Sequence, residues 1–273
     1  MRARPLRRVS SSRNPALALV RALDAKRTRR ERRLVVLEGE DLIDAALAAW
    51  LRPEALLVDD ERVPNEDPRL LATADIDERY AVPADLLKQV SGLAAAPRMI
   101  GVFPQPGPYS FSNVTMPPAL ALWLAGVGDP GNVGTLIRTS AALGCDWIAL
   151  APGSADASNP KAVRAAMGAT FTIPVLDGVR AEDLATRDGV RVVAAVTTGG
   201  VPPWDADLAS PAVIALGAER GGLEQSLGPL DAAGRVVRVT IPQDAGAESL
   251  NVAAAGAILL AEARRQRAST PAI

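Results

Sequence analysis

The sequence of 273 residues contains no histidine. Its absence removes the usual general base, the Ser-His-Asp triad and most zinc sites. Any proton transfer must therefore use Asp, Glu, Lys, Tyr, Cys or an unusual Arg, and we expect no bound metal. Cysteine is nearly absent as well, since the single Cys145 excludes an internal disulfide framework and fits a reducing compartment. We therefore expect a cytoplasmic protein.

Long apolar runs are also missing, because Pro, Gly or a charged residue interrupts each one before it reaches membrane-spanning length. The Arg-rich N-terminus lacks the apolar segment and the cleavage site of a secretory signal. Hydrophobic residues nevertheless make up 48% of the chain, which is enough for a substantial core. These features predict a soluble protein with one large domain or two ordinary ones.

The net charge of −1 conceals a lopsided distribution. Between Met1 and Arg33 there are twelve Arg or Lys residues against two acids, while the rest of the chain carries 18 basic and 29 acidic residues. A basic arm on an otherwise acidic protein predicts a polyanionic partner, with nucleic acid first. The alternative is a solvated, disordered arm without a partner.

Short strands and helices alternate in the first part of the chain. The segment 15–33 has Leu17, Val20 and Leu23 at helical spacing, and its end, KRTRRERR, is a candidate for binding phosphate. A second helix is expected at 41–51, and buried strands are expected at 34–37, 56–58 and 98–104. This alternation predicts a small α/β domain over 15–104, preceded by a mobile basic arm at 1–14.

The stretch 105–118 contains four prolines and no periodicity, which predicts an interdomain linker. Beyond it, apolar strands are expected at 119–127, 147–151, 173–176, 190–196, 212–216 and 236–241. Helices are expected at 133–143, 161–167 and from Val252 to Ala263. Because the strands are hydrophobic almost throughout, they predict a parallel sheet covered on both faces. The fold class is therefore α/β, with a second domain over 119–267 and a short tail at 268–273.

The sequence GVGDPG at Gly126–Gly131 matches the GxGxxG pattern of dinucleotide-binding folds. It follows a strand and precedes a helix, so a nicotinamide-dependent oxidoreductase has to be considered. Two features argue against that class. Asp129 would place a carboxylate where a pyrophosphate sits, and the next strand ends at Leu150 without an acidic residue to hold a ribose. A simple Pro-Gly turn is the alternative.

Three further segments place polar residues or glycines at the ends of predicted strands. They are NVGTLIRTSAALG at 132–144, VIALGAERGGL at 213–223, and IPQDAGAESLNVAAAGAILLAEARRQ at 241–266. In the last of these, Ser249 or Asn251 can cap a helix rich in small residues, which can approach another backbone closely. Ligands in α/β folds usually bind at such junctions. Each segment taken singly is equally compatible with a turn, a cap or a surface ion pair.

Taken together and in this order, the three segments resemble the signature motifs of the SpoU (TrmH-like) branch of the SPOUT RNA methyltransferases. NPKAVRAAMGATFTIPV at 159–175 is also similar to that family, and RRLVVLEGEDLIDAAL at 32–47 is similar to its ribosomal-protein-like substrate-binding domain. The resemblance implies S-adenosylmethionine-dependent 2′-O-methylation of a ribose in RNA, with 23S ribosomal RNA favoured over transfer RNA. It also implies a homodimer formed through the C-terminal domain, and a trefoil knot in that domain that holds the cofactor. General rules of chain topology argue against knots, so this expectation comes from the resemblance alone.

The resemblance also assigns residues. The residues that match the family's catalytic polar set are Asn132, Arg138, Ser249 and Asn251. The residues expected around the cofactor are Leu216, Gly217, Glu219, Gly222, Ile241, Gln243, Leu250 and Asn251. The residues expected to contact RNA phosphates are Arg27, Arg29, Arg30, Arg32 and Arg33. The chain departs from the family at Ala218, Arg220 and Gln243, which touch the cofactor loops but remove no acid, base or catalytic Arg.

A guanidinium is almost always protonated, so Arg138 is expected to bind the phosphate beside the reacting hydroxyl rather than to act as a base. With aromatic residues at only 3%, base stacking is expected to be minor. An RNA-binding protein without catalytic activity is a competing hypothesis, although Asn132, Arg138 and Asn251 are retained. Whether the enzyme is a housekeeping methyltransferase or protects a ribosome against an antibiotic is left open by the sequence.

Overall fold

The computed structural model describes residues 5–218, 223–244 and 249–269. The chain divides into two compact units, the first formed by Met1–Pro106 with Ser158–Phe171 and the second by Gly107–Ala157 with Thr172–Ile273. In the part of the chain that is described, no helix is both long enough and apolar enough to cross a membrane.

The first unit contains a five-stranded mixed sheet in the order β1-β4-β3-β5-β2. Its strands are β1 (Arg7–Arg8), β2 (Leu34–Glu38), β3 (Ala55–Val58), β4 (Arg79–Ala81) and β5 (Met99–Pro104). Its helices are α1 (Pro15–Ala22), α2 (Lys26–Arg32), α3 (Glu40–Ala48), α4 (Pro68–Ala72), α5 (Ala84–Val90) and α7 (Pro160–Ala166). Successive residues of β2 alternate between two cores, so that Val36 packs with α1 and α5 while Val35 packs with α3 and α4. The sheet is therefore buried on both faces.

Two expectations for the start of the chain are wrong. Arg7–Arg8 is not part of a mobile arm, because it pairs in parallel with β4, and the buried Val9 continues this contact by donating its N–H to the carbonyl of Ala81. The helix expected over 15–33 is broken into α1 and α2 at Leu23–Ala25. No Gly or Pro marks this break, and its carbonyls are instead bound by a side chain described below.

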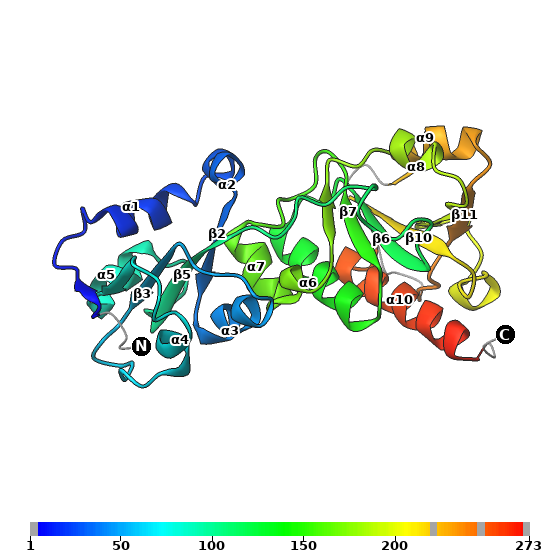
Figure 1. The fold of residues 1–273 in the computed structure, drawn as a ribbon. Helices are drawn as coiled ribbons and strands as arrows, with labels where there is room; N and C mark the ends of the chain where they lie inside the picture. The colour runs from blue at the N-terminus through cyan, green and yellow to red at the C-terminus, as the bar shows by residue number, and fades with distance from the viewer. Residues whose placement is uncertain (1–4, 219–222, 245–248, 270–273) are drawn as a thin grey trace. The chain divides into compact units, whose positions relative to one another are not determined.

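The second unit contains a six-stranded sheet in the order β11-β9-β10-β6-β7-β8 (Figure 1), and every pair of neighbouring strands is parallel. Its strands are β6 (Leu120–Ala125), β7 (Trp147–Leu150), β8 (Val175–Asp177), β9 (Val192–Ala195), β10 (Ala212–Gly217) and β11 (Val236–Val239). Its helices are α6 (Pro130–Ala142), α8 (Ala181–Ala185), α9 (Glu224–Ala232) and α10 (Val252–Ser269). The predicted parallel sheet is thus confirmed.

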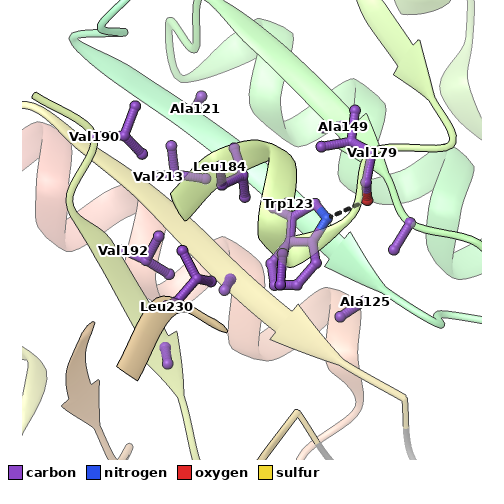
Figure 2. Packing of buried hydrophobic residues seen from close by; sticks show 14 of the residues in the cluster. Ala121, Trp123, Ala125, Ala149, Val179, Leu184, Val190, Val192, Val213 and Leu230 are labelled. Carbon is purple, nitrogen blue, oxygen red and sulfur yellow. Dashed lines mark hydrogen bonds between the residues drawn. The ribbon is translucent and has the colours of Figure 1, made fainter. Parts of the chain in front are cut away.

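Helices cover both faces of this second sheet. On one face, Trp123 packs with Leu184 of α8 and Leu230 of α9, and its indole N–H donates to the carbonyl of Val179 at 3.0 Å (Figure 2). On the other face, α10 packs against α6 so closely that a Cβ added at Gly256 would lie 2.4 Å from the Leu136 side chain. The missing side chain at Gly256 therefore leaves room for the side chain of Leu136.

Two segments pack differently from the domain limits expected from the sequence. The proline-rich stretch is not a free linker, because Phe111 stacks edge-on against Trp147 with ring centroids 5.8 Å apart, and Trp147 donates to the carbonyl of Thr115. The second domain is also not continuous, because Ser158–Phe171 packs in the first unit. There Val163 joins the apolar core, and Arg164 forms an ion pair with the buried Glu38.

Candidate active site

The carboxyl ends of β9, β10 and β11 surround a cavity of about 210 Å3, here called the strand-end cavity. The start of α10 closes it. It is lined by Ala195, Val196, Thr197, Thr198, Leu216, Gly217, Ala218, Leu223, Glu224, Val239, Ile241, Gln243, Ser249, Leu250, Val252 and Ala255. Six residues expected at the site are among them: Leu216, Gly217, Ile241, Gln243, Ser249 and Leu250. Glu219 and Gly222 lie outside the described residues.

Glycine allows the cavity walls to approach one another closely. A Cβ at Gly217 would lie 2.5 Å from the backbone nitrogen of Leu223, and a Cβ at Gly200 would lie 2.7 Å from that of Thr240. Distances below 3.0 Å are essentially never found for real Cβ atoms, so both positions require a bare backbone. Gly217 lines the cavity, so this part of the wall is formed by backbone without a side chain.

Two helix N-termini meet beside this cavity through Asn132 and Asn251. The Asn251 amide donates to the Asn132 side-chain oxygen at 3.1 Å, although the two residues come from different helices. Asn251 also caps α10, because its own side-chain oxygen accepts from the N–H of Ala253 at 2.8 Å. Asp129 caps α6 in the same way by accepting from the N–H of Asn132 at 2.9 Å. The sequence-predicted pair is thus brought together, and each helix start is fixed.

A second space, here called the adjoining hollow, opens next to Asn132. It has a volume of about 230 Å3 and is lined by Gly126, Val127, Gly128, Asp129, Asn132, Ala218 and Val252. Ala218 and Val252 line the strand-end cavity as well, so the two spaces share a wall. The adjoining hollow lies at the carboxyl ends of the neighbouring strands β6 and β10, and the strand-end cavity lies at those of β9, β10 and β11. The carboxyl ends of parallel strands are the usual ligand position in open α/β sheets. A ligand in each space would meet the other at Ala218 and Val252.

Arg138 is not brought to this meeting point. It lies on α6 six residues after Asn132, which is a rotation of about 240° around the helix. Its side chain is exposed, and within the described part of the chain it has no hydrogen bond or ion pair. The guanidinium is therefore available to a group other than Asn132 and Asn251.

Three polar residues that line the cavity carry no motif that predicted them, namely Thr197, Thr198 and Glu224. The threonines directly follow the buried strand β9, so the rule that parallel strands end at one edge would have located them. Glu224 is the first residue of α9 and had no such signal. Both of its carboxylate oxygens accept from Arg238, which also binds Asp231, and these hydrogen bonds lower the pKa of Glu224 and of Asp231.

The expected phosphate-binding arginines fall into two groups. Arg29 is only 1% exposed, and its guanidinium donates to the carbonyls of Leu23 and Asp24 at 2.8 and 2.6 Å. A buried side chain with these partners cannot contact RNA, so the expectation for Arg29 is wrong and its role is structural. The exposed members of the group are Arg27, Arg30, Arg32 and Arg33, of which Arg27 is paired with Glu31.

The glycine-rich GVGDPG turn does not form a pyrophosphate site. The Asp129 carboxylate occupies the N-terminus of α6, where a phosphate would have to bind the free N–H groups. A negative charge in this place repels a pyrophosphate, and this disfavours the oxidoreductase alternative. In the described part of the chain there is also no group of three or more His, Cys, Asp or Glu residues that could hold a metal ion.

The SpoU rRNA Methylase family matches residues 119–261, and the MRM3-like substrate binding domain matches residues 14–101. The chain belongs to the SpoU rRNA methylase family.

Individual relatives span nearly the whole chain. The 23S rRNA (guanosine(2553)-2′-O)-methyltransferase RlmP of Bacillus subtilis is 29% identical over 93% of this chain and 98% of its own. The 23S rRNA (uridine(2479)-2′-O)-methyltransferase of Streptomyces viridochromogenes is 29% identical over 97% and 94%. The AdoMet-bound rRNA methyltransferase from Sinorhizobium meliloti superimposes with a TM-score of 0.82 at 30% identity, over 96% of this chain and 98% of that structure.

Proposed function

We propose that this protein transfers the methyl group of S-adenosylmethionine to a ribose 2′-hydroxyl of RNA, with 23S ribosomal RNA as the substrate. The observation that carries the proposal is the shared wall at Ala218 and Val252 between the strand-end cavity and the adjoining hollow. Two ligands bound in these spaces would lie side by side, as a methyl donor and its acceptor must. Relatives of full length that are named as 23S rRNA 2′-O-methyltransferases support the choice of RNA.

The strand-end cavity has the chemistry that S-adenosylmethionine needs. Apolar side chains such as Leu216, Val239 and Ile241 suit the faces of an adenine, and the bare peptide groups at Gly217 can pair with its edge. The neutral polar groups Thr197, Thr198, Gln243 and Ser249 supply further hydrogen bonds. When bound, the cofactor supplies an electrophilic methyl group on a sulfonium.

The protein's own residues orient the acceptor. With the cofactor held in the strand-end cavity, its methyl group would pass to the ribose O2′ with release of S-adenosylhomocysteine, and the hydroxyl proton would pass to solvent water. Asn132 and Asn251, fixed by their mutual hydrogen bond and by the helix starts, are placed to align the hydroxyl in the adjoining hollow. Arg138 is positively charged throughout, so it binds the adjacent phosphate and favours loss of the proton electrostatically.

The placement of Arg138 favours a homodimer. Its guanidinium lies away from its own Asn132, and the outward face of α10 carries Ala254, Ile258 and Ala261 at helical spacing, with Ile258 41% exposed. A second copy that packs on these faces of α6 and α10 would bury the apolar stripe and bring Arg138 to the partner's site. We therefore propose that each active site is completed by the other subunit.

Three finer expectations belong to the same proposal. The segment after β11 lies against the loop that follows β9, since Thr240 donates to the carbonyl of Val201 at 2.9 Å, and this close contact fits a trefoil knot. The exposed arginines Arg27, Arg30, Arg32 and Arg33 bind RNA phosphates from the first unit. We assign the reaction to the cytoplasm, in keeping with the bacterial relatives that are named as 23S rRNA methyltransferases. A transfer RNA substrate and an antibiotic-resistance role remain the alternatives.

Subunit complementation tests both the site and its assembly. Arg138→Ala and Asn251→Ala should each lose at least about 100-fold in single-turnover methyl transfer, because each removes one of the aligned groups. If Arg138 acts across the dimer, mixing the two inactive proteins should restore about a quarter of the wild-type rate, since half of the dimers are mixed and each has one intact site.

The outcomes separate the parts of the proposal. A mixture that stays inactive although mixed dimers form would show that Arg138 acts within its own protomer. Full activity of Arg138→Ala alone, with RNA bound, would remove this residue from the mechanism. A calorimetric titration that finds no binding of S-adenosylmethionine to the wild-type protein would favour an RNA-binding module without activity.

A further inference from the structure

The only ionisable group among the described residues of the strand-end cavity is the carboxylate of Glu224. The other described lining residues are apolar or neutral. A carboxylate among neutral groups accepts hydrogen bonds from a ligand's donors and offers none in return. The sequence motifs did not assign Glu224 to any role.

Arg238 holds this carboxylate in one orientation. Its Nε donates to one Glu224 oxygen at 3.1 Å, and a terminal nitrogen donates to the other oxygen at 2.9 Å. The same guanidinium binds both oxygens of Asp231 at 2.9 and 2.8 Å, so β11 is linked to both ends of α9. A fork of this kind fixes the plane of the carboxylate and occupies one lone pair of each oxygen. The remaining lone pair of each oxygen is left for a ligand.

We propose that Glu224 is a cofactor-binding residue whose two oxygens accept the 2′- and 3′-hydroxyls of the adenosyl ribose. The inference rests on the proposed function, which places the adenosyl group beside Leu216, Gly217 and Ile241 in the cavity that Glu224 lines. Two adjacent hydroxyls match two carboxylate oxygens, and an acidic residue at a strand-end loop serves ribose in the same way in dinucleotide-binding folds. If Glu224 bound the cofactor's ammonium group in place of the ribose, that group would lie a few ångströms from the Arg238 guanidinium and be repelled by it.

Asp231 provides a matched control. It binds the same guanidinium but does not line the cavity. Glu224→Gln and Asp231→Asn are both isosteric and both remove one charge from the Arg238 network. If the network acts only on structure, the two variants should behave alike, whereas a ligand contact affects Glu224→Gln alone.

Calorimetry with two probes then identifies which part of the cofactor Glu224 binds. S-adenosylhomocysteine carries both the ribose and the amino-acid end, while 5′-methylthioadenosine carries the ribose without the amino acid. We expect Glu224→Gln to weaken both probes about 10-fold, and Asp231→Asn to change either by less than about 2-fold. On the wild-type protein, 2′-deoxy-5′-methylthioadenosine should bind about 10-fold more weakly than its parent, a result that needs no variant to fold.

Four results would overturn the inference. They are equal losses in both variants, no loss in Glu224→Gln, a loss confined to S-adenosylhomocysteine, and no discrimination against the 2′-deoxy probe by the wild-type protein. The third would assign the carboxylate to the ammonium group. In each of these cases the proposed function still holds if the wild-type protein binds S-adenosylhomocysteine. If the wild-type protein does not bind S-adenosylhomocysteine, the proposed function itself is wrong.

Discussion

Gly217→Ala is the substitution for which the structure gives the clearest expectation. The glycine ends β10, and an added methyl group would lie 2.5 Å from the Leu223 nitrogen and 2.8 Å from its Cα. Both atoms belong to the backbone, so rotation of a side chain cannot relieve the contact. To reach even 3.0 Å, the start of α9 has to move by roughly half an ångström relative to β10.

The change in the free energy of unfolding that Gly217→Ala causes is the sum of two opposing effects. Overpacking of this kind destabilises the folded state by about 1–3 kcal/mol. Alanine also restricts the unfolded chain more than glycine does, which stabilises the protein by about 0.4–1 kcal/mol. A net destabilisation of about 1–2 kcal/mol corresponds to a fall in Tm of about 2–8 °C for a domain of this size. Gly217 and Leu223 both line the strand-end cavity, so the affinity for S-adenosylmethionine should fall at least about 10-fold.

Calorimetric melting and titration with S-adenosylmethionine measure both effects. Gly128→Ala is the matched control, because nothing lies within 4 Å of its added Cβ, and it lines the adjoining hollow but not the strand-end cavity. It should melt within about 0.5 kcal/mol of the wild type and bind the cofactor equally well. The reasoning is refuted if Gly217→Ala behaves like Gly128→Ala in both measurements.

Two further predictions concern buried polar groups. Arg29→Ala should lower the free energy of unfolding by about 3 kcal/mol, because it removes the hydrogen bonds that the buried guanidinium donates to the carbonyls of Leu23 and Asp24. Replacement of the exposed Arg32 by Ala should change stability by less than about 0.5 kcal/mol and should instead weaken RNA binding. Denaturant titration and salt-dependent RNA binding distinguish the two, and a stable Arg29→Ala that has lost RNA affinity would restore Arg29 to the RNA-binding set. Burial raises the pKa of the Cys145 thiol from an ordinary value of 9.0 to about 12, so the unfolded chain releases this proton first and stability should fall between about pH 9 and 12. Because the partly exposed thiol is protonated in the native state, a thiol reagent at pH 8 should label the native protein more slowly than the unfolded chain, and equal rates would contradict the raised pKa.

Several parts of the fold follow from local sequence. Uninterrupted apolar strands such as β6 and β10 predicted a parallel sheet, because only a sheet covered on both faces buries every residue of a strand. Asn251 was expected to cap a helix and does so. The family resemblance assigned Leu216, Ile241 and Ser249 to the site, and all three line the cavity. The sequence also indicated that the segments carrying them lie at strand–loop–helix junctions, where ligands usually bind.

Other features depend on contacts between distant residues, which no local pattern reveals. Arg29 is one of several arginines in KRTRRERR, and only its bonds to Leu23 and Asp24 distinguish it from its exposed neighbours. The packing of Val163 in the first unit requires the core of that unit to exist. Glu224 gains its orientation from Arg238, which lies on another element.

The account's central claim is that the methyl group goes to a ribose oxygen of RNA. The most direct test incubates the protein with 23S ribosomal RNA and S-adenosylmethionine labelled in the methyl group, and then digests the RNA with alkali. A 2′-O-methyl group blocks cleavage of the adjoining phosphodiester, so the account predicts that the label is recovered in an alkali-resistant dinucleotide. Label recovered in mononucleotides, as a methylated base gives, or no transfer despite binding of both ligands, would contradict it.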